Sequence, residues 1–87
     1  LLDFYATWCT PCKIQKAVID ELKEKYKNKI IFKEVDVDEN KKMSETYFVE
    51  AIPTILIEKD SKIIKRFVGM TSAKKIEKDI DMLLKEE

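Results

Sequence analysis

The stretch LLDFYATWCTPC, residues 1–12, decides the fold. Its first six residues are apolar or aromatic except for Asp3, a pattern that predicts a short buried strand over residues 1–6. Thr10 and Pro11 then supply a capping residue and a first-turn proline, so a helix is expected to begin there. The chain therefore opens with a strand, a tight connection and a helix, and both of its cysteines lie at the start of that helix.

The rest of the chain continues this alternation of strands and helices. The expected elements are a first helix to about Tyr26, a strand over residues 30–37, a short helix over 41–48, strands over 54–58 and 63–68, and a last helix capped by Thr71 or Ser72. The order β-α-β-α-β-β-α predicts an α/β fold, with helices on both faces of a mixed sheet, in one domain over residues 1–87. The first strand is expected to be internal, with both faces covered.

Composition argues against several classes of function. Acidic and basic residues number 17 each, so the chain has no net field to attract nucleic acid or an anionic membrane. No apolar run approaches the ~20 residues of a membrane span. We therefore expect neither a nucleic-acid partner nor a membrane partner. The sequence begins at Leu1 without an initiator methionine, which leaves open a targeting segment that has been removed.

The two cysteines favour redox chemistry. Both lie in one four-residue motif, whereas domains stapled by disulfides spread more cysteines along the chain. With no histidine in the sequence, two thiolates cannot complete a four-ligand zinc site, so we expect no metal and no cofactor. Because a helix N-terminus favours a thiolate, the spacing predicts Cys9 as the outer nucleophile and Cys12 as the resolving thiol. A pair of small buried apolar residues is the weaker alternative.

Four segments resemble the thioredoxin family: DFYATWCTPCK (3–13), VDVDEN (35–40), AIPT (51–54) and FVG (67–69), in the family's order. The resemblance covers essentially the whole chain and implies a thioredoxin-like three-layer α/β/α sandwich. It also implies a thiol–disulfide oxidoreductase that reduces protein disulfides, in which Cys9 forms a mixed disulfide and Cys12 resolves it. The usual N-terminal strand and helix are not in this sequence, so the strand over 30–37 is expected to be an exposed apolar edge.

The resemblance assigns roles to residues around the cysteines. Asp3 is implied to take the proton of Cys12, provided that its strand is covered; on a half-exposed strand it would face water. Pro53 is implied to be cis and to face the cysteines, although a proline can simply begin a strand. Gly69, the only glycine, is implied to admit a substrate backbone; a strand-end bulge is the alternative. The expected substrate-binding residues are Trp8, Pro11, Ile52, Pro53, Gly69 and Met70.

Three positions depart from the family pattern. Thr10 replaces the commoner glycine, Ala17 stands where many members carry a helix-kinking proline, and Glu34 stands where many bacterial members carry lysine. These departures leave three properties open: the redox potential, the straightness of the first helix and the charge around Asp3.

The leading interpretation is a monomeric cytoplasmic protein-disulfide reductase that is recycled by thioredoxin reductase and serves electron transport and cell redox homeostasis. An extracytoplasmic oxidase, isomerase or cytochrome-maturation reductase of the same superfamily is the second interpretation. Pro11 favours the reductase, because oxidase and isomerase members often carry histidine there. A non-catalytic binding module that uses the surface of Trp8, Ile52, Gly69 and Met70 is the third, and retention of both cysteines argues against it.

Overall fold

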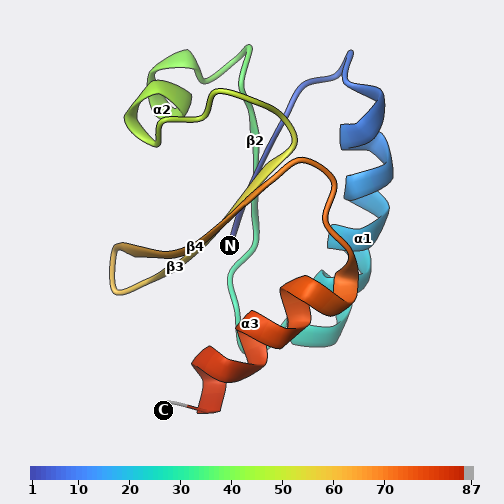
Figure 1. Ribbon diagram of the computed structural model, residues 1–87, viewed down its shortest axis with the longest axis vertical. Coiled ribbons are helices and arrows are strands. Elements are labelled where there is room, and N and C mark those ends of the chain that lie inside the picture. Colours follow the sequence, from blue (N-terminus) through green and yellow to red (C-terminus); the bar gives the residue numbers. More distant parts are fainter. Residues whose placement is uncertain (86–87) are drawn as a thin grey trace.

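A computed structural model describes residues 1–85 of the chain and confirms the expected order of elements (Figure 1). Residues 86–87 of the domain expected over 1–87 lie outside this range. The elements are β1 (Leu2–Tyr5), α1 (Thr10–Tyr26), β2 (Lys33–Asp36), α2 (Lys41–Thr46), β3 (Thr54–Lys59), β4 (Lys62–Val68) and α3 (Ala73–Lys85). No helix within residues 1–85 is both long enough and apolar enough to cross a membrane.

The four strands form one mixed sheet in the order β2-β1-β3-β4. β1 pairs in parallel with β2 and antiparallel with β3, and β3 pairs antiparallel with β4. α1 and α3 lie on one side of this sheet and α2 lies on the other (Figure 1). The predicted three-layer α/β/α arrangement is therefore present, and β1 is internal with both of its faces covered.

Two apolar clusters hold the layers together, and β3 contributes to both because successive side chains of a strand point to opposite faces. Ile55 and Ile57 pack with the helices on one face, whereas Leu56 packs with β1 and β2 on the other. The first cluster is built on Ile19, Leu22 and Tyr26 of α1 and Ile76 and Ile80 of α3. The second joins Leu2, Phe4 and Val35 to Met43 of α2 and to Tyr47, which directly follows α2.

The cap of α1 differs from the one expected, whereas the cap of α3 is one of the two residues expected. Cys9, and not Thr10, is the N-cap of α1: its Sγ accepts a hydrogen bond from the backbone N–H of Cys12 at 3.3 Å. Thr10 is the first helical residue, with Pro11 directly after it. At the start of α3, the hydroxyl of Ser72 accepts from the N–H of Lys75 at 3.4 Å, so Ser72 takes the capping role. One sulfur therefore belongs both to the cysteine pair and to the cap of α1.

Two predicted elements are shorter than expected. β2 covers only Lys33–Asp36, the four residues that pair with the four residues of β1. Ile30 is not part of the strand, because its N–H bonds to the carbonyl of Tyr26 in the turn after α1. α2 ends at Thr46, since Phe48 takes a φ of 55° that no right-handed helix accommodates. In contrast, the β3–β4 hairpin is longer than predicted, because Asp60 and Ser61 both adopt positive φ in a two-residue turn.

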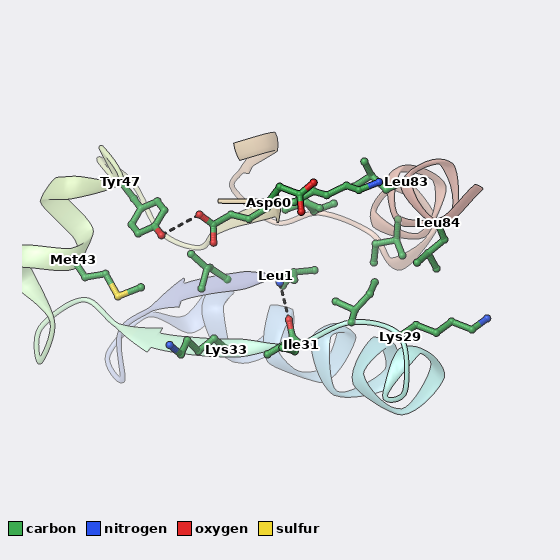
Figure 2. A pocket seen from close by; sticks show the side chains of 15 residues that line it. Leu1, Lys29, Ile31, Lys33, Met43, Tyr47, Asp60, Leu83 and Leu84 are labelled. Atoms are coloured by element: carbon green, nitrogen blue, oxygen red, sulfur yellow. Dashed lines mark hydrogen bonds between the residues drawn. The ribbon is translucent and has the colours of Figure 1, made fainter. Parts of the chain in front are cut away.

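Ile31, which lies in the predicted strand but before β2, is 85% exposed, whereas β2 itself, an edge of the sheet as predicted, is not apolar. Its exposed and half-buried positions carry Lys33, Glu34 and Asp36, and its one apolar side chain, Val35, is buried. Beyond β2, a hollow of about 630 Å³ opens between the N-terminus, α2 and α3. Figure 2 shows it flanked by two hydrogen bonds, from the Leu1 amino group to the Ile31 carbonyl and from the Tyr47 hydroxyl to Glu58. None of the residues that line this hollow is a cysteine.

Candidate active site

The cysteine pair lies where the carboxyl end of β1 meets the first turn of α1. Cys9 and Cys12 are joined by a disulfide, their Cα atoms are 5.2 Å apart, and both side chains are buried. Sγ of Cys9 accepts the N–H of Cys12, one of the donors that a helix start leaves unpaired. A thiolate at Cys9 would be stabilised by that donor and by the positive end of the helix dipole. The helix geometry thus lowers the free energy of the charged form at Cys9.

Asp3 is buried behind this pair. Its side chain is 2% exposed, and within residues 1–85 its Oδ1 has no hydrogen-bond partner. A hollow of about 250 Å³ is lined by Asp3 and Cys12, among others. Burial raises the pKa of the Asp3 carboxyl to about 6, and the negative charge of Glu34 adds to the effect. Of the two predicted placements for Asp3, the buried one is confirmed.

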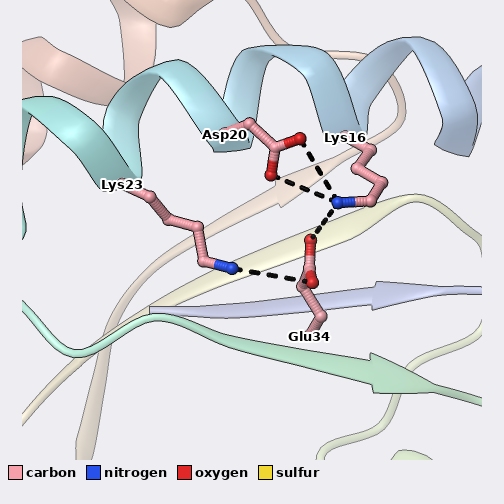
Figure 3. A network of polar contacts seen from close by, with 4 residues as sticks. All are labelled: Lys16, Asp20, Lys23 and Glu34. Carbon is pink, nitrogen blue, oxygen red and sulfur yellow. Dashed lines mark hydrogen bonds and ion pairs between the residues drawn. The ribbon is translucent and has the colours of Figure 1, made fainter.

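The charge around Asp3, which the sequence left open, comes from a network between α1 and β2 (Figure 3). Asp3 and Glu34 are direct neighbours across the parallel β1–β2 ladder. Glu34 is in turn contacted by two ammonium groups, Lys16 at 3.4 Å and Lys23 at 3.7 Å, and Lys16 also bonds Asp20 at 3.2 Å. The lysines and Asp20 are exposed and Glu34 is half-buried, so these surface pairs add little to stability. Their effect is to offset part of the negative charge that Glu34 brings to Asp3.

Pro53 and Gly69 lie side by side at the same end of the sheet. The Ile52–Pro53 peptide bond is cis, as the resemblance implied. Ile52 packs against the cluster formed by Ala6 and the two cysteines, and the carbonyl of Pro53 accepts the N–H of Gly69 at 2.8 Å. Gly69 has a φ of +86°, and a Cβ added to it would meet no atom within 4 Å. The backbone conformation therefore explains this glycine, and the space above it is open.

The remaining predicted binding residues are exposed around this end. Trp8 is 68% exposed beside Cys9, Met70 is 55% exposed beside Gly69, and Pro11 is exposed on the first turn of α1. The indole N–H of Trp8 donates to Asp38 at 2.8 Å. α1 runs without interruption through Ala17 to Tyr26, consistent with the loss of proline at that position.

Two residues of this site, Gln15 and Asp38, were not predicted from the sequence. Asp38 holds the indole of Trp8 from a loop 30 residues away, and no local pattern reveals such a pair. Gln15 is 1% exposed, and its side-chain amide bonds both backbone groups of Thr71. A signal for Gln15 was present, since it stands three residues after Cys12 and four before Ile19, on the buried face of α1.

A buried cysteine pair that caps a helix, with a protonatable carboxyl behind it and exposed apolar side chains around it, is the apparatus of thiol–disulfide exchange. Within residues 1–85 there is no group of three or more histidine, cysteine or acidic side chains that could hold a metal ion. Fold and site together therefore define a thiol–disulfide oxidoreductase.

Comparisons with known proteins specify the family. The family model described as Thioredoxin matches residues 1–82. The chain is 40% identical over 81 residues to a thioredoxin of Chlorobaculum thiosulfatiphilum, which covers 93% of this chain and 75% of that protein. A thioredoxin of Staphylococcus aureus is 37% identical over 81 residues, with 93% of this chain and 78% of that protein covered. The chain belongs to the thioredoxin family.

Solved structures agree with this assignment. The germline-specific thioredoxin Deadhead of Drosophila melanogaster superposes with a TM-score of 0.86 at 33% identity, covering 94% of this chain and 77% of that chain. The oxidised form of mitochondrial thioredoxin 3 of Saccharomyces cerevisiae gives a TM-score of 0.82 at 35% identity, covering 92% and 74% respectively. The predicted fold class is thereby confirmed.

Proposed function

We propose that this protein is a protein-disulfide reductase in which Cys9 is the nucleophile and Cys12 the resolving thiol. The single observation that carries the assignment of roles is the hydrogen bond from the N–H of Cys12 to Sγ of Cys9 at the N-terminus of α1. Because that donor stabilises a thiolate at Cys9, this sulfur is the one prepared to attack.

The reaction begins with the reduced pair. The Cys9 thiolate attacks one sulfur of a substrate disulfide, that S–S bond breaks, and the departing substrate sulfur takes up a proton. Cys12 then loses its proton and attacks Sγ of Cys9, which closes the Cys9–Cys12 disulfide and releases the second substrate thiolate. Two electrons pass from the cysteine pair to the substrate.

Asp3 is proposed to accept the proton of Cys12 in the resolving step. It lines the same hollow as Cys12, and its Oδ1 is not engaged in a hydrogen bond with any described residue. A carboxyl with a pKa of about 6 is largely ionised near neutral pH, yet basic enough to take a proton for a short time. Such a group removes the proton of Cys12 when the mixed disulfide forms.

The substrate is proposed to bind as an extended polypeptide over Trp8, Pro11, Ile52, Pro53, Gly69 and Met70. The open space above Gly69 and the exposed faces of Trp8 and Met70 support this surface. Membership of the thioredoxin family implies protein disulfide substrates and, usually, a thioredoxin reductase as the electron donor. We place the protein in the cytoplasm as a monomer, in electron transport and redox homeostasis; its bacterial relatives support that setting, although a chloroplastic thioredoxin of Arabidopsis thaliana is also 35% identical.

The roles of the two cysteines are tested by trapping the mixed disulfide. Reduced Cys12→Ser should form a stable covalent adduct with insulin, because Cys9 attacks but nothing resolves the product. Cys9→Ser is the matched control and should form little adduct. Mass spectrometry of the non-reduced mixture separates the two results. An adduct of equal yield on Cys9→Ser, through Cys12, would contradict the assignment.

The role of Asp3 is tested by Asp3→Asn, which keeps the size of the side chain but cannot accept the proton. We expect turnover on insulin to fall roughly 10- to 100-fold, since positioned general bases contribute at least this much. Alkylation of Cys9 by iodoacetamide should stay near the unmodified rate, because the Asp3 proposal concerns only Cys12. Unchanged turnover would reject this role.

A further inference from the structure

Gln15 is a buried polar residue on the face of α1 that packs against the sheet. The other buried residues of that helix are Cys12, Ile19, Leu22 and Tyr26, and Gln15 is 1% exposed among them. Burying an amide is unfavourable unless its donor and acceptor are both bonded, whereas an apolar side chain would fill the same place without that requirement. The presence of glutamine here therefore calls for a specific partner.

That partner is the backbone of Thr71, 56 residues further along the chain. The amide nitrogen of Gln15 donates to the carbonyl of Thr71 at 3.0 Å, and the N–H of Thr71 donates to the amide oxygen of Gln15 at 2.7 Å. Thr71 lies in the connection between β4 and α3, outside both elements. Two bonds to one residue, one to its N–H and one to its C=O, fix both the position and the orientation of that segment relative to α1.

The contacts continue from Thr71 to the cis-proline. The hydroxyl of Thr71 donates to the carbonyl of Gly69 at 3.0 Å, and the N–H of Gly69 donates to the carbonyl of Pro53 at 2.8 Å. A connected series of hydrogen bonds thus runs from the first turns of α1, through the 69–71 turn, to the start of β3. Among the hydrogen bonds of residues 1–85, the two between Gln15 and Thr71 join this series to the helix that carries Cys9 and Cys12.

We propose that Gln15 is a positioning residue for polypeptide substrates, which holds the 69–71 turn in place beside the Cys9–Cys12 pair. This inference rests on the proposed function and adds to it the residue that fixes one wall of the docking surface. A turn that is held before the substrate arrives need not be ordered on binding, so affinity for an extended polypeptide is higher. A small disulfide without a peptide backbone contacts only the cysteine sulfurs, so its affinity does not depend on the 69–71 turn.

Gln15→Met tests the inference, because methionine has a similar length but makes neither hydrogen bond. We expect the KM for insulin to rise roughly three- to tenfold with little change in kcat, the effect of losing one or two hydrogen bonds. The rate with bis(hydroxyethyl) disulfide, and the thiol–disulfide equilibrium of Cys9–Cys12 with glutathione, should stay within about twofold. Glu21→Met, which places the same side chain on the exposed face of α1, is the matched control. It should change neither the KM for insulin nor the rate with bis(hydroxyethyl) disulfide. An equal loss with both substrates, or an unchanged KM for insulin, would overturn the proposal.

A second measurement uses the unmodified chain and does not depend on the folding of a variant. The N–H of Thr71 lies outside every helix and strand, so its protection from hydrogen exchange would come from Gln15. We expect exchange at least roughly tenfold slower than in the unfolded chain. Exchange at the unfolded rate would contradict the proposal that Gln15 holds the 69–71 turn in place. Activity of the same chain on bis(hydroxyethyl) disulfide tests the proposed function separately, since Gln15 has no part in that reaction.

Discussion

A buried hydroxyl at one end of α1 has its hydrogen bond complete, whereas a buried carboxyl of β1 beside the other end does not. Near its C-terminal end the hydroxyl of Tyr26 donates to Asp81 at 2.6 Å, and the surrounding cluster of Ile19, Leu22 and α3 is otherwise apolar. Near its N-terminal end Asp3 is buried with an oxygen that has no partner among the described residues. A polar group whose bonds are complete contributes to stability, whereas an incomplete one lowers stability and is available for proton transfer. The C-terminal half of α1 therefore holds the fold, and the N-terminal half carries the chemistry.

The largest effect is expected from Ile19→Ala, in the half that holds the fold. Ile19 is fully buried between α1 and the sheet, so truncation should lower the free energy of unfolding by about 2–5 kcal/mol. Urea denaturation measures this loss. The rate with bis(hydroxyethyl) disulfide, measured where the variant is folded, should be unchanged. A loss below about 1 kcal/mol, or a lower rate of the folded variant, would contradict the division of roles between the two halves of α1.

Asp3 should make the protein less stable as pH rises. The folded pKa of about 6 lies above the ordinary value of 3.8, so below pH 3.8 the carboxyl is protonated in both states and imposes no penalty. Between the two values the unfolded state ionises first, and stability falls until the pH passes the folded pKa. The total is about 3 kcal/mol, at about 1.4 kcal/mol for each pKa unit. Urea denaturation of the unmodified chain and of Asp3→Asn at pH 4 and pH 7.5 should show that this component disappears in the variant. An identical pH dependence in both would mean that Asp3 is not buried as described.

Tyr26→Phe removes the part-buried hydrogen bond that joins the C-terminal end of α1 to Asp81 of α3. Burial and the carboxylate of Asp81 raise the pKa of Tyr26, so its hydroxyl stays protonated and donating through the neutral range. Its removal should cost about 1 kcal/mol of unfolding free energy and leave insulin reduction unchanged. Reduced activity at full stability would show that this end of the helix also serves the chemistry.

The smallest effect is expected at Glu34→Gln, which alters the field at Asp3 without touching the cysteines. The substitution removes a neighbouring negative charge and the ion pairs of Glu34 with Lys16 and Lys23, while Lys16 keeps its bond to Asp20. The pKa of Asp3 should therefore fall, by less than about one unit, since burial is the larger cause and stays the same. Carboxyl chemical shifts in an NMR titration measure it. A rise in the pKa would contradict the described network.

Local patterns in the sequence predicted most of the fold. The apolar run before the cysteines and the proline between them were sufficient to place β1, α1 and the cysteine pair, and the topology was sufficient to bury Asp3. The length of β2 was overestimated because the alternation of side chains extends back to Ile30. In the structure the N–H of Ile30 bonds instead to the carbonyl of Tyr26, the last residue of α1. The same limit applies to the cap of α1, where a sulfur occupies the place expected for a hydroxyl.

The parts of the site that the sequence did not predict depend on partners distant in the chain. Gln15 and Thr71 are 56 residues apart, and Trp8 and Asp38 are 30 apart. One member of the first pair is a backbone group, which has no sequence signature at all. Such contacts are determined only when α1, the 69–71 turn and the loop after β2 are brought together by the packed sheet.

The equilibrium redox potential of Cys9–Cys12 against glutathione tests the central claim most directly. The N–H of Cys12 bonds Sγ of Cys9 at the helix start, the buried Asp3 lines the same hollow as Cys12, and Thr10 replaces the commoner glycine between the cysteines. A protein-disulfide reductase should have a potential below about −230 mV, near that of thioredoxins as a class. A value above about −180 mV, in the range of isomerases and oxidants, would contradict the account.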